Sequence, residues 1–404
     1  MASSSSQNVG KGKRVLLTGG NGFVASHILN DLVERSYSVT ATVRSEDKAQ
    51  AVYKTHPNWK ENVKFEYVAD LTKKGAFDHL FEGAGQPFDY IIHTASPVTF
   101  KVKDIQKDLI DPAIQGTIGV FESAQKLAGP TLKRIVLLGS AVAVLNTFED
   151  KTKAGKDYTE ADWNPVTSTY AIQNNDVVSG YNASKVESER AAWKIMKEKN
   201  PSFDLAVINP DIITGPMIHP MSGAKSVNET NRFAIYNFLD GTHQKVEGVE
   251  FPFYHFVDVR DVARAHVDSL TNPAASGKRI LMVAGLITPQ LVVNTVRKAF
   301  PQLQSKIPEG NPRQILPPNN EPTGWDTSAS VKILSEGTSS GKWEFISLEK
   351  SLTDAVQKSG LMDPSDWHEL DEALVSHFGG PPPNAGLSQQ ERRDERSRKK
   401  EGKK

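Results

Sequence analysis

The stretch KRVLLTGGNGFVASHILNDLV, residues 13–33, decides the fold of this chain. It opens with an apolar run, continues through a glycine-rich turn and closes with apolar residues spaced along one helix face. That face consists of Ala25, Ile28, Leu29, Leu32 and Val33, at i, i+3, i+4, i+7 and i+8. The pattern therefore predicts a buried strand that turns tightly into an amphipathic helix.

The turn itself, TGGNGFVA at residues 18–25, has the glycine spacing of a dinucleotide-binding loop. Gly19 allows the tight turn, Gly22 lets the backbone approach a pyrophosphate, and small Ala25 lets the helix lie close to the strand. The free N–H groups at the helix N-terminus would then face the phosphates. The alternative is a merely structural turn. We predict a dinucleotide site that includes Gly19, Asn21, Gly22, Phe23 and Val24.

Further Val-, Ile- and Leu-rich runs alternate with segments of helical period along the first half of the chain. They are SVTATVR from Ser38, VKFEYVAD from Val63, DYIIHTAS from Asp89, RIVLLGSAVAV from Arg134 and DLAVINP from Asp204. Nearly continuous apolar runs indicate strands covered on both faces, which is typical of parallel sheets. We therefore predict an α/β fold, a doubly wound parallel (Rossmann) sheet with a smaller, discontinuous C-terminal substrate lobe.

Length and proline content divide the chain into lobes and tails. Its 404 residues exceed the roughly 250 to 300 residues that one hydrophobic core serves. Five prolines between residues 308 and 324 do not fit a regular sheet. The predicted parts are a flexible leader (1–12), a dinucleotide-binding domain (13–208 and 253–285), a substrate lobe (209–252 and 286–378) and a disordered charged tail (379–404).

The composition excludes several classes of function. Lys plus Arg and Asp plus Glu number 48 each, so no net charge draws the chain to nucleic acid or an anionic membrane. The absence of cysteine removes disulfides, thiolate nucleophiles and cysteine-based metal sites. The sequence shows no signal-peptide core and no stretch as long as a membrane span. We expect a cytoplasmic protein that binds neither nucleic acid, membrane nor metal.

The end of the second predicted strand indicates which dinucleotide binds. An acidic residue there would hydrogen-bond the ribose 2′-hydroxyl of NAD. This sequence has Arg44 instead, followed by Lys48 one helical turn later. A guanidinium matches a 2′-phosphate in charge and geometry, so the sequence favours NADPH. Asp47 between them leaves open the alternative that both are ordinary surface cations.

Three residues are candidates for catalysis. Tyr181 and Lys185 lie four residues apart in YNASK, on one face of a predicted helix, and Tyr181 alone of the nine tyrosines has this spacing. A nearby ammonium lowers the pKa of a phenol from about 10 toward neutrality, which suits a general acid. Ser140 ends the fifth predicted strand, at the sheet edge where ligands bind. The alternative is an exposed tyrosine on an amphipathic helix.

Two other chemistries find no support in the sequence. A serine hydrolase would need a G-x-S-x-G turn, but Ser140 stands in Gly139-Ser140-Ala141-Val142. The ten histidines are scattered without metal-binding spacing. We interpret them as structural or surface groups.

Taken together, the motifs resemble the extended short-chain dehydrogenase/reductase family, in its branch of dihydroflavonol reductases, cinnamoyl-CoA reductases and yeast-type methylglyoxal (aldehyde) reductases. The match covers about residues 13–378. It rests on TGGNGFVA, VRSEDK, HTASPV, DLIDPAIQGT, LGSAVAV, YNASK, INPDIITGP and HFVDVRDVARAH, in that order.

The resemblance implies an NADPH-dependent reductase of aldehydes or ketones with a small-molecule carbonyl substrate. We expect the protein to be a monomer or homodimer. It implies that Tyr181 donates the proton, that Lys185 holds the nicotinamide ribose and that Ser140 polarises the carbonyl. The further cofactor contacts it implies are Asp70, Leu71, Thr94, Ala95, Ser96, Pro210 and Ile213. The alternatives are a sugar epimerase or hydroxysteroid dehydrogenase with the same triad, and a non-catalytic NADP-sensing protein.

This sequence departs from the family pattern at three places. A single serine, Ser140, ends the fifth strand where two are usual. A long stretch separates Ser140 from Tyr181, and EGTSSGK at residues 336–342 looks inserted. Substrate range is therefore not carried over from the family.

The residues expected to face the nicotinamide suggest an apolar substrate. They are Pro97, Val98, Phe100, Val142, Val144, Ile212 and Met217. An apolar wall binds by removing area from water, whereas a sugar diphosphate would need converging Arg and Lys side chains. The alternative is a pocket lined by residues 217–252, which include Lys225, Arg232 and Lys245.

Overall fold

The computed structural model describes residues 8–82, 87–96, 102–223, 226–338 and 340–358. The strands are β1 (Arg14–Thr18), β2 (Ser38–Val43), β3 (Val63–Tyr67), β4 (Tyr90–His93), β5 (Arg134–Leu138), β6 (Asp204–Pro210), β7 (Ile212–Thr214), β8 (His255–Asp258), β9 (Lys278–Met282) and β10 (Gly285–Leu286). The α-helices are α1 (Phe23–Glu34), α2 (Glu46–Thr55), α3 (His79–Glu82), α4 (Asp111–Leu127), α5 (Ser168–Asn174), α6 (Val177–Lys199), α7 (Glu229–Asn231), α8 (Asn237–Leu239), α9 (Val259–Thr271), α10 (Pro289–Ala299), α11 (Ser328–Glu336) and α12 (Leu348–Lys358). Shorter segments include a 3-10 turn, η4 (Ala141–Ala143), and a π-helical segment, η6 (Arg232–Tyr236).

Seven parallel strands form the main sheet, in the order β3-β2-β1-β4-β5-β6-β9. The chain first builds outward from β1 to β3 and then continues on the other side of β1 with β4. The strand order therefore reverses between β1 and β4, and ligands of open α/β sheets bind at such a switch point. This topology confirms the predicted doubly wound parallel fold.

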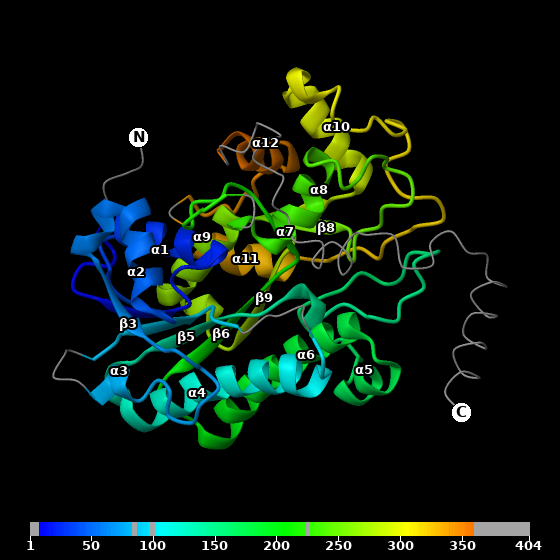
Figure 1. Ribbon diagram of the computed structural model, residues 1–404. Coiled ribbons are helices and arrows are strands. Elements are labelled where there is room, and N and C mark those ends of the chain that lie inside the picture. Colours follow the sequence, from blue (N-terminus) through cyan, green and yellow to red (C-terminus); the bar gives the residue numbers. More distant parts are fainter. Residues whose placement is uncertain (1–7, 83–86, 97–101, 224–225, 339, 359–404) are drawn as a thin grey trace.

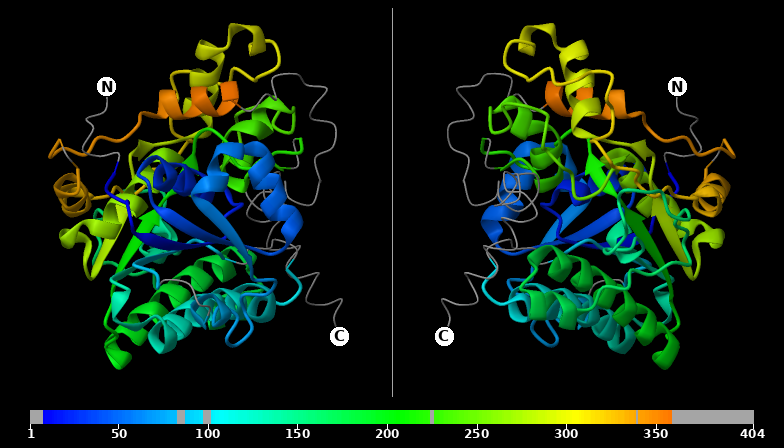
Figure 2. Two further views of the ribbon diagram at one scale, coloured as in Figure 1. Left: turned by 90° about the vertical axis from the view of Figure 1, so that its left-hand side faces the viewer. Right: turned by 90° about the vertical axis from the view of Figure 1, so that its right-hand side faces the viewer.

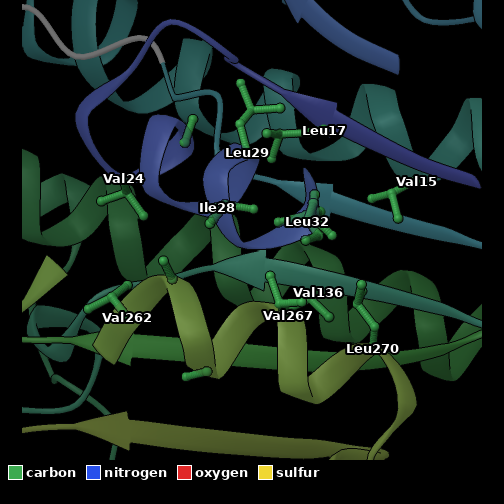
Figure 3. Close-up of a cluster of buried hydrophobic side chains, with 14 of the residues drawn as sticks. Val15, Leu17, Val24, Ile28, Leu29, Leu32, Val136, Val262, Val267 and Leu270 are labelled. Carbon is green, nitrogen blue, oxygen red and sulfur yellow. The ribbon is translucent and has the colours of Figure 1, made fainter. Parts of the chain in front are cut away.

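Helices cover both faces of the main sheet, with α1, α2 and α9 on one side and α3, α4 and α6 on the other (Figures 1 and 2). Successive side chains of β1 point to opposite faces, as a strand requires. Val15 and Leu17 enter the core with α1 and α9, whereas Leu16 packs with residues of α4 and α6. Figure 3 shows Ile28 of α1 and Val262 of α9 within the first of these cores.

A second sheet, in the order β10-β8-β7, belongs to the smaller lobe. β7 follows β6 after one residue, and β8 leads directly into α9, which precedes β9 of the main sheet. The chain therefore passes from one sheet to the other at these points. The helices α7, α8, α10 and α12 gather around it (Figure 1), with a separate core that includes Phe233, Phe238, Phe251 and Leu352. Residues 253–285, assigned from sequence to the dinucleotide-binding domain, thus contribute β8 to the small sheet and β9 to the main sheet.

The structure describes part of the predicted leader but not the predicted tail. Gly10 is buried and donates its N–H to the Arg35 carbonyl (2.9 Å), so packed contacts begin inside the predicted leader, 1–12. The predicted tail, 379–404, lies outside the described residues, as do Pro97, Val98 and Phe100. Within the described part of the chain, no helix is both long and apolar enough to cross a membrane.

Candidate active site

A cavity of about 170 Å³ opens at the carboxyl ends of β1 to β4, at the switch point of the main sheet. The predicted cofactor residues that line it are Gly19, Gly22, Arg44, Leu71, Thr94, Ala95 and Ser96. Sequence analysis missed four further lining residues, Thr42, Val43, Val68 and Phe77. Three of these four stand at or just after the ends of β2 and β3, which is a signal that the topology could have supplied.

The glycine-rich turn is shaped to leave backbone open to a ligand. Gly19 has φ +76°, and a Cβ there would lie 3.2 Å from the Ala95 Cα. The α1 helix begins at Phe23, directly after the lining residue Gly22, and no side chain caps its N-terminus, so its first N–H groups have no side-chain partner. Such a helix N-terminus favours phosphate. The turn therefore fits the pyrophosphate of a dinucleotide.

The loop after β4 is tied to β1 by one hydroxyl. Thr18 Oγ1 accepts hydrogen bonds from the Thr94 N–H (3.1 Å) and the Ala95 N–H (3.0 Å), and it contacts His93 Nδ1 at 2.8 Å. These bonds hold the predicted cofactor residues 94–96 against the glycine turn.

Arg44, directly after β2, is one of the two cations predicted to bind the 2′-phosphate. It is exposed, lines the cavity and forms no hydrogen bond or ion pair with any residue in the described ranges. Asp70 lies close enough for Arg44 to help lower its pKa, although hydrogen bonds from Thr72 lower it more. Lys48, on α2, is exposed and does not line the cavity. Arg44 is therefore the better placed of the two predicted phosphate ligands.

Four of the predicted cofactor residues line neither this cavity nor a second, larger one that is described below. Val24 packs into the α1 core, Asp70 accepts bonds from Thr72, and Ile213 lies on β7 beside β8. Asn21 belongs to the turn but is not a lining residue. Any contact that these four make with a dinucleotide stays a prediction.

A larger cavity, of about 440 Å³, brings together two of the three predicted catalytic residues, Ser140 and Tyr181, while Lys185 is not among its lining residues. Ser140, Tyr181 and Pro210 line it with Phe23, Val142, Asp211, Ile212, Asn228, Glu229, Thr230, Phe233, Pro252 and Phe253. Phe23 directly follows Gly22 of the first cavity, so both cavities are lined by residues at the start of α1.

The larger cavity corrects part of the expected apolar wall. Val142 and Ile212 line it, but Val144 and Met217 are buried elsewhere in the chain. Lys245 is exposed and Arg232 is buried, and neither lines the cavity; Lys225 lies outside the described residues. Residues 336–342 contribute no lining residue among those described.

The α6 helix places Tyr181 and Lys185 one turn apart. It begins at Val177, where the Asp176 side chain accepts from the N–H groups of Val178 and Ser179. Lys185 Nζ lies 5.6 Å from the centre of the Tyr181 ring and donates to Ser96 Oγ at 3.3 Å. Lys185 therefore contacts both Tyr181 and the loop of the first cavity.

The ionisation of these groups differs from the sequence prediction. Burial raises the pKa of Tyr181 to about 12, while a side-chain hydrogen bond with Ser140 acts in the opposite direction. Burial lowers the pKa of Lys185 to about 8. In the chain alone the pKa of the phenol is thus not brought toward neutrality, because desolvation by burial outweighs the hydrogen bond with Ser140.

A network of buried hydrogen bonds holds the backbone at Ser140 in place. Asn209 Nδ2 donates to the Ser140 carbonyl (3.0 Å) and to Glu189 Oε2 (2.9 Å), and Arg279 Nε donates to Glu189 Oε1 (2.6 Å). Glu189 is 1% exposed. It follows Lys185 by four residues on α6, so it shares the helix face of Tyr181, a spacing that sequence analysis did not use.

Comparison with known proteins places these features in context. The model of the NAD dependent epimerase/dehydratase family matches residues 15–285. The chain is 33% identical over 351 residues to a putative NADPH-dependent methylglyoxal reductase of Candida albicans, covering 85% of this chain and 97% of that protein. It is 35% identical over 311 residues to a cinnamoyl-CoA reductase of Medicago truncatula, covering 76% and 85%.

Solved structures give the same picture. Yeast methylglyoxal/isovaleraldehyde reductase complexed with NADPH matches with a TM-score of 0.76 and 29% identity, covering 85% of this chain and 97% of that one. A reductase of Candida albicans in complex with NADPH matches with a TM-score of 0.74 and 30% identity, covering 87% and 99%. The similarity therefore extends over most of the chain, including parts of both lobes.

Proposed function

The chain belongs to the NAD dependent epimerase/dehydratase family, and we propose that it is an NADPH-dependent carbonyl reductase in which Tyr181 protonates the product oxygen. The reaction is the reduction of an aldehyde or ketone to an alcohol. The observation that carries the proposal is one cavity lined by both Ser140 and Tyr181, whose lining residue Phe23 directly follows Gly22 of the dinucleotide cavity.

Ser140 and Tyr181, which line the larger cavity, have different roles at the substrate oxygen. NADPH, when bound, supplies a hydride to the carbonyl carbon. Ser140 donates a hydrogen bond to the carbonyl oxygen, and Tyr181 gives up its proton as negative charge develops there. A phenol with a pKa of about 12 is fully protonated at neutral pH, so it is ready to act as an acid. Lys185, charged below pH 8, stabilises the phenolate that remains.

The cofactor preference rests on Arg44. Its guanidinium has no partner among the described residues and lines the cavity at the end of β2, where a 2′-phosphate can receive two parallel hydrogen bonds. Gly19, Gly22 and residues 94–96 would hold the rest of the dinucleotide along the switch point. Relatives named for NADPH dependence support the same choice.

The substrate is a small or medium, largely apolar carbonyl compound. Val142, Ile212, Phe233, Pro252 and Phe253 supply the apolar wall. No lysine or arginine is among the described lining residues, whereas Asp211 and Glu229 are. A phosphate or carboxylate on the substrate would meet no cation and two acidic groups, so charged metabolites are disfavoured. Most of this wall comes from residues 209–252, in keeping with a substrate lobe.

Two alternative functions make different demands on the site. A sugar epimerase or hydroxysteroid dehydrogenase would share Ser140, Tyr181 and Lys185. An NAD-dependent enzyme of this kind, however, would be expected to have an acidic residue at the position of Arg44. A non-catalytic NADP-sensing protein would have no need of Ser140 and Tyr181 in one cavity.

We also propose a cytoplasmic location, which the lack of cysteine supports, and a monomeric or homodimeric state.

An NADPH-oxidation screen over aliphatic and aromatic aldehydes and ketones tests the function. Catalytic efficiency should rise with apolar size up to a limit and fall when a carboxylate or phosphate is added to the same skeleton. Preference for the charged substrates would refute the apolar assignment. An absence of NADPH oxidation with every carbonyl compound would refute the reductase.

A further inference from the structure

Asp211 is a buried acidic residue of the larger cavity that the proposed reaction does not use. It follows β6 directly, and the parallel register of β5 and β6, continued by two residues, places Ser140 beside Pro210. Asp211 is therefore one residue beyond the catalytic serine along the same sheet edge. It lines the same cavity as Ser140 and Tyr181 and is 7% exposed.

The two oxygens of the Asp211 carboxyl differ in their partners. Oδ1 accepts a hydrogen bond from the Ile212 N–H at 2.9 Å. Oδ2 is buried, and none of the residues that the structure describes gives it a hydrogen-bond partner. A polar group left unpaired in the interior costs free energy, so an unpaired atom beside a ligand cavity points to a ligand.

The groups around Asp211 favour its protonated form. Glu149, in the loop after η4, opposes a negative charge on it, and no lysine or arginine is among the described residues that line the cavity; Glu229 of α7 lines the cavity but is not among the groups that shift the pKa of Asp211. The other titratable groups on this side are Tyr181 and Lys185 of α6. Burial, helped by Glu149, raises the pKa of Asp211 to about 8 against the effect of its backbone hydrogen bond. At neutral pH its O–H is thus a donor that needs an acceptor.

We propose that protonated Asp211 donates a hydrogen bond to a second, acceptor oxygen of the substrate, close to the carbonyl that is reduced. This inference rests on the proposed reduction at Ser140 and Tyr181 and adds a selectivity to it. Carbonyl compounds with an ether, hydroxyl or second carbonyl oxygen next to the reacting group bind better than hydrocarbon counterparts of the same size. An ionised Asp211 has no proton to donate and repels the same oxygen.

Methoxyacetone and pentan-2-one provide a matched test, because an ether oxygen in the first replaces a methylene group in the second. We would measure kcat/KM of the full chain with NADPH for both ketones between pH 6 and 9. Effects common to both, including loss of charge on Lys185, cancel in the ratio of the two values. The ratio should be highest near neutral pH and fall about 3- to 10-fold as the pH rises through 8.

Four variants separate this role from a structural one. Asp211→Asn keeps the size, the acceptor for Ile212 and a donor at every pH, so its ratio should stay high and flat. Asp211→Leu should give a low, flat ratio. Glu149→Gln removes a neighbouring negative charge and should move the fall to lower pH. Glu229→Gln is the matched control, and it should leave the pH of the fall unchanged.

The outcomes distinguish a failure of the proposed role of Asp211 from a failure of the proposed reductase function. A wild-type ratio that does not vary with pH would overturn the role of Asp211 while leaving the reductase intact. The same fall in Asp211→Asn as in the wild type would do so too. Failure of the whole carbonyl screen would overturn the proposed function and this role together.

Discussion

The Nζ atom of Lys185 lies 5.6 Å from the centre of the Tyr181 ring, one turn away on α6. At this distance the lysine acts on the tyrosine through its charge rather than through a hydrogen bond to the ring. Its own hydrogen bond goes to Ser96 Oγ, on the loop that borders the dinucleotide cavity. One side chain thus connects Tyr181, the proposed proton donor, with the cavity proposed for the cofactor.

This relationship predicts a pH dependence of the reduction. The pKa of Lys185 is lowered to about 8, so its charge is present below pH 8 and lost above it. The rate with pentan-2-one, which has no second oxygen, should therefore fall as the pH rises through 8. Lys185→Met should be slow throughout and lose this step. Lys185→Arg, which stays charged, should keep a flat profile over the same range; a fall of wild-type size in that variant would contradict the assignment.

Arg44 should control the choice of cofactor. Loss of a charge-assisted contact to the 2′-phosphate should weaken NADPH binding about 10- to 150-fold in Arg44→Ala and leave NADH binding nearly unchanged. Calorimetric dissociation constants for both nucleotides measure this difference. Lys48→Ala is the control, because Lys48 does not line the cavity and its loss should have a smaller effect. Equal affinity of the wild type for NADPH and NADH would refute the preference.

The buried Arg279–Glu189 pair should be important for stability. Arg279→Met would remove the ion-pair partner of Glu189, which is 1% exposed, and should cost about 3 to 5 kcal/mol in denaturant unfolding. The exposed Lys298–Glu349 pair provides the contrast, and Lys298→Met should cost at most about 1 kcal/mol. Because Glu189 reaches Ser140 through Asn209, Arg279→Met should also slow turnover. Similar losses of stability in the two variants would argue against a supporting network.

Asp211 makes a prediction about stability that does not depend on any substrate. Its pKa is about 8 in the folded chain against an ordinary value of 3.8, so the folded state binds an extra proton between these two pH values. The stability that this group contributes is therefore present at low pH and lost as the pH rises through 8. The melting temperature of Asp211→Asn, relative to the wild type, should increase steadily from pH 5 to pH 8. A constant difference would mean that Asp211 is ionised throughout.

The sequence predicted those features that local pattern determines. The strand runs, the glycine turn at Gly19 and the four-residue spacing of Tyr181 and Lys185 all appear where they were expected. Parallel topology then placed Ser140 and Tyr181 in one cavity, since the carboxyl ends of parallel strands share an edge.

Features that arise from long-range packing could not be predicted from the sequence. Arg279 is 90 residues from Glu189 in the chain, and nothing local indicates their pairing. The raised pKa values of Tyr181 and Asp211 come from burial, which only the assembled lobes create. Phe253 likewise enters the cavity because the loop before β8 folds over it.

The most direct test of the account is a single-turnover measurement on Tyr181→Phe. NADPH and a good ketone substrate are mixed with excess enzyme, and the rate of NADPH oxidation is recorded together with the alcohol formed. The wild type should form one alcohol per NADPH oxidised. Tyr181→Phe keeps the ring but lacks the acid, so NADPH affinity should stay within about twofold while the rate falls about 100-fold or more. A wild-type rate in Tyr181→Phe would contradict the central claim.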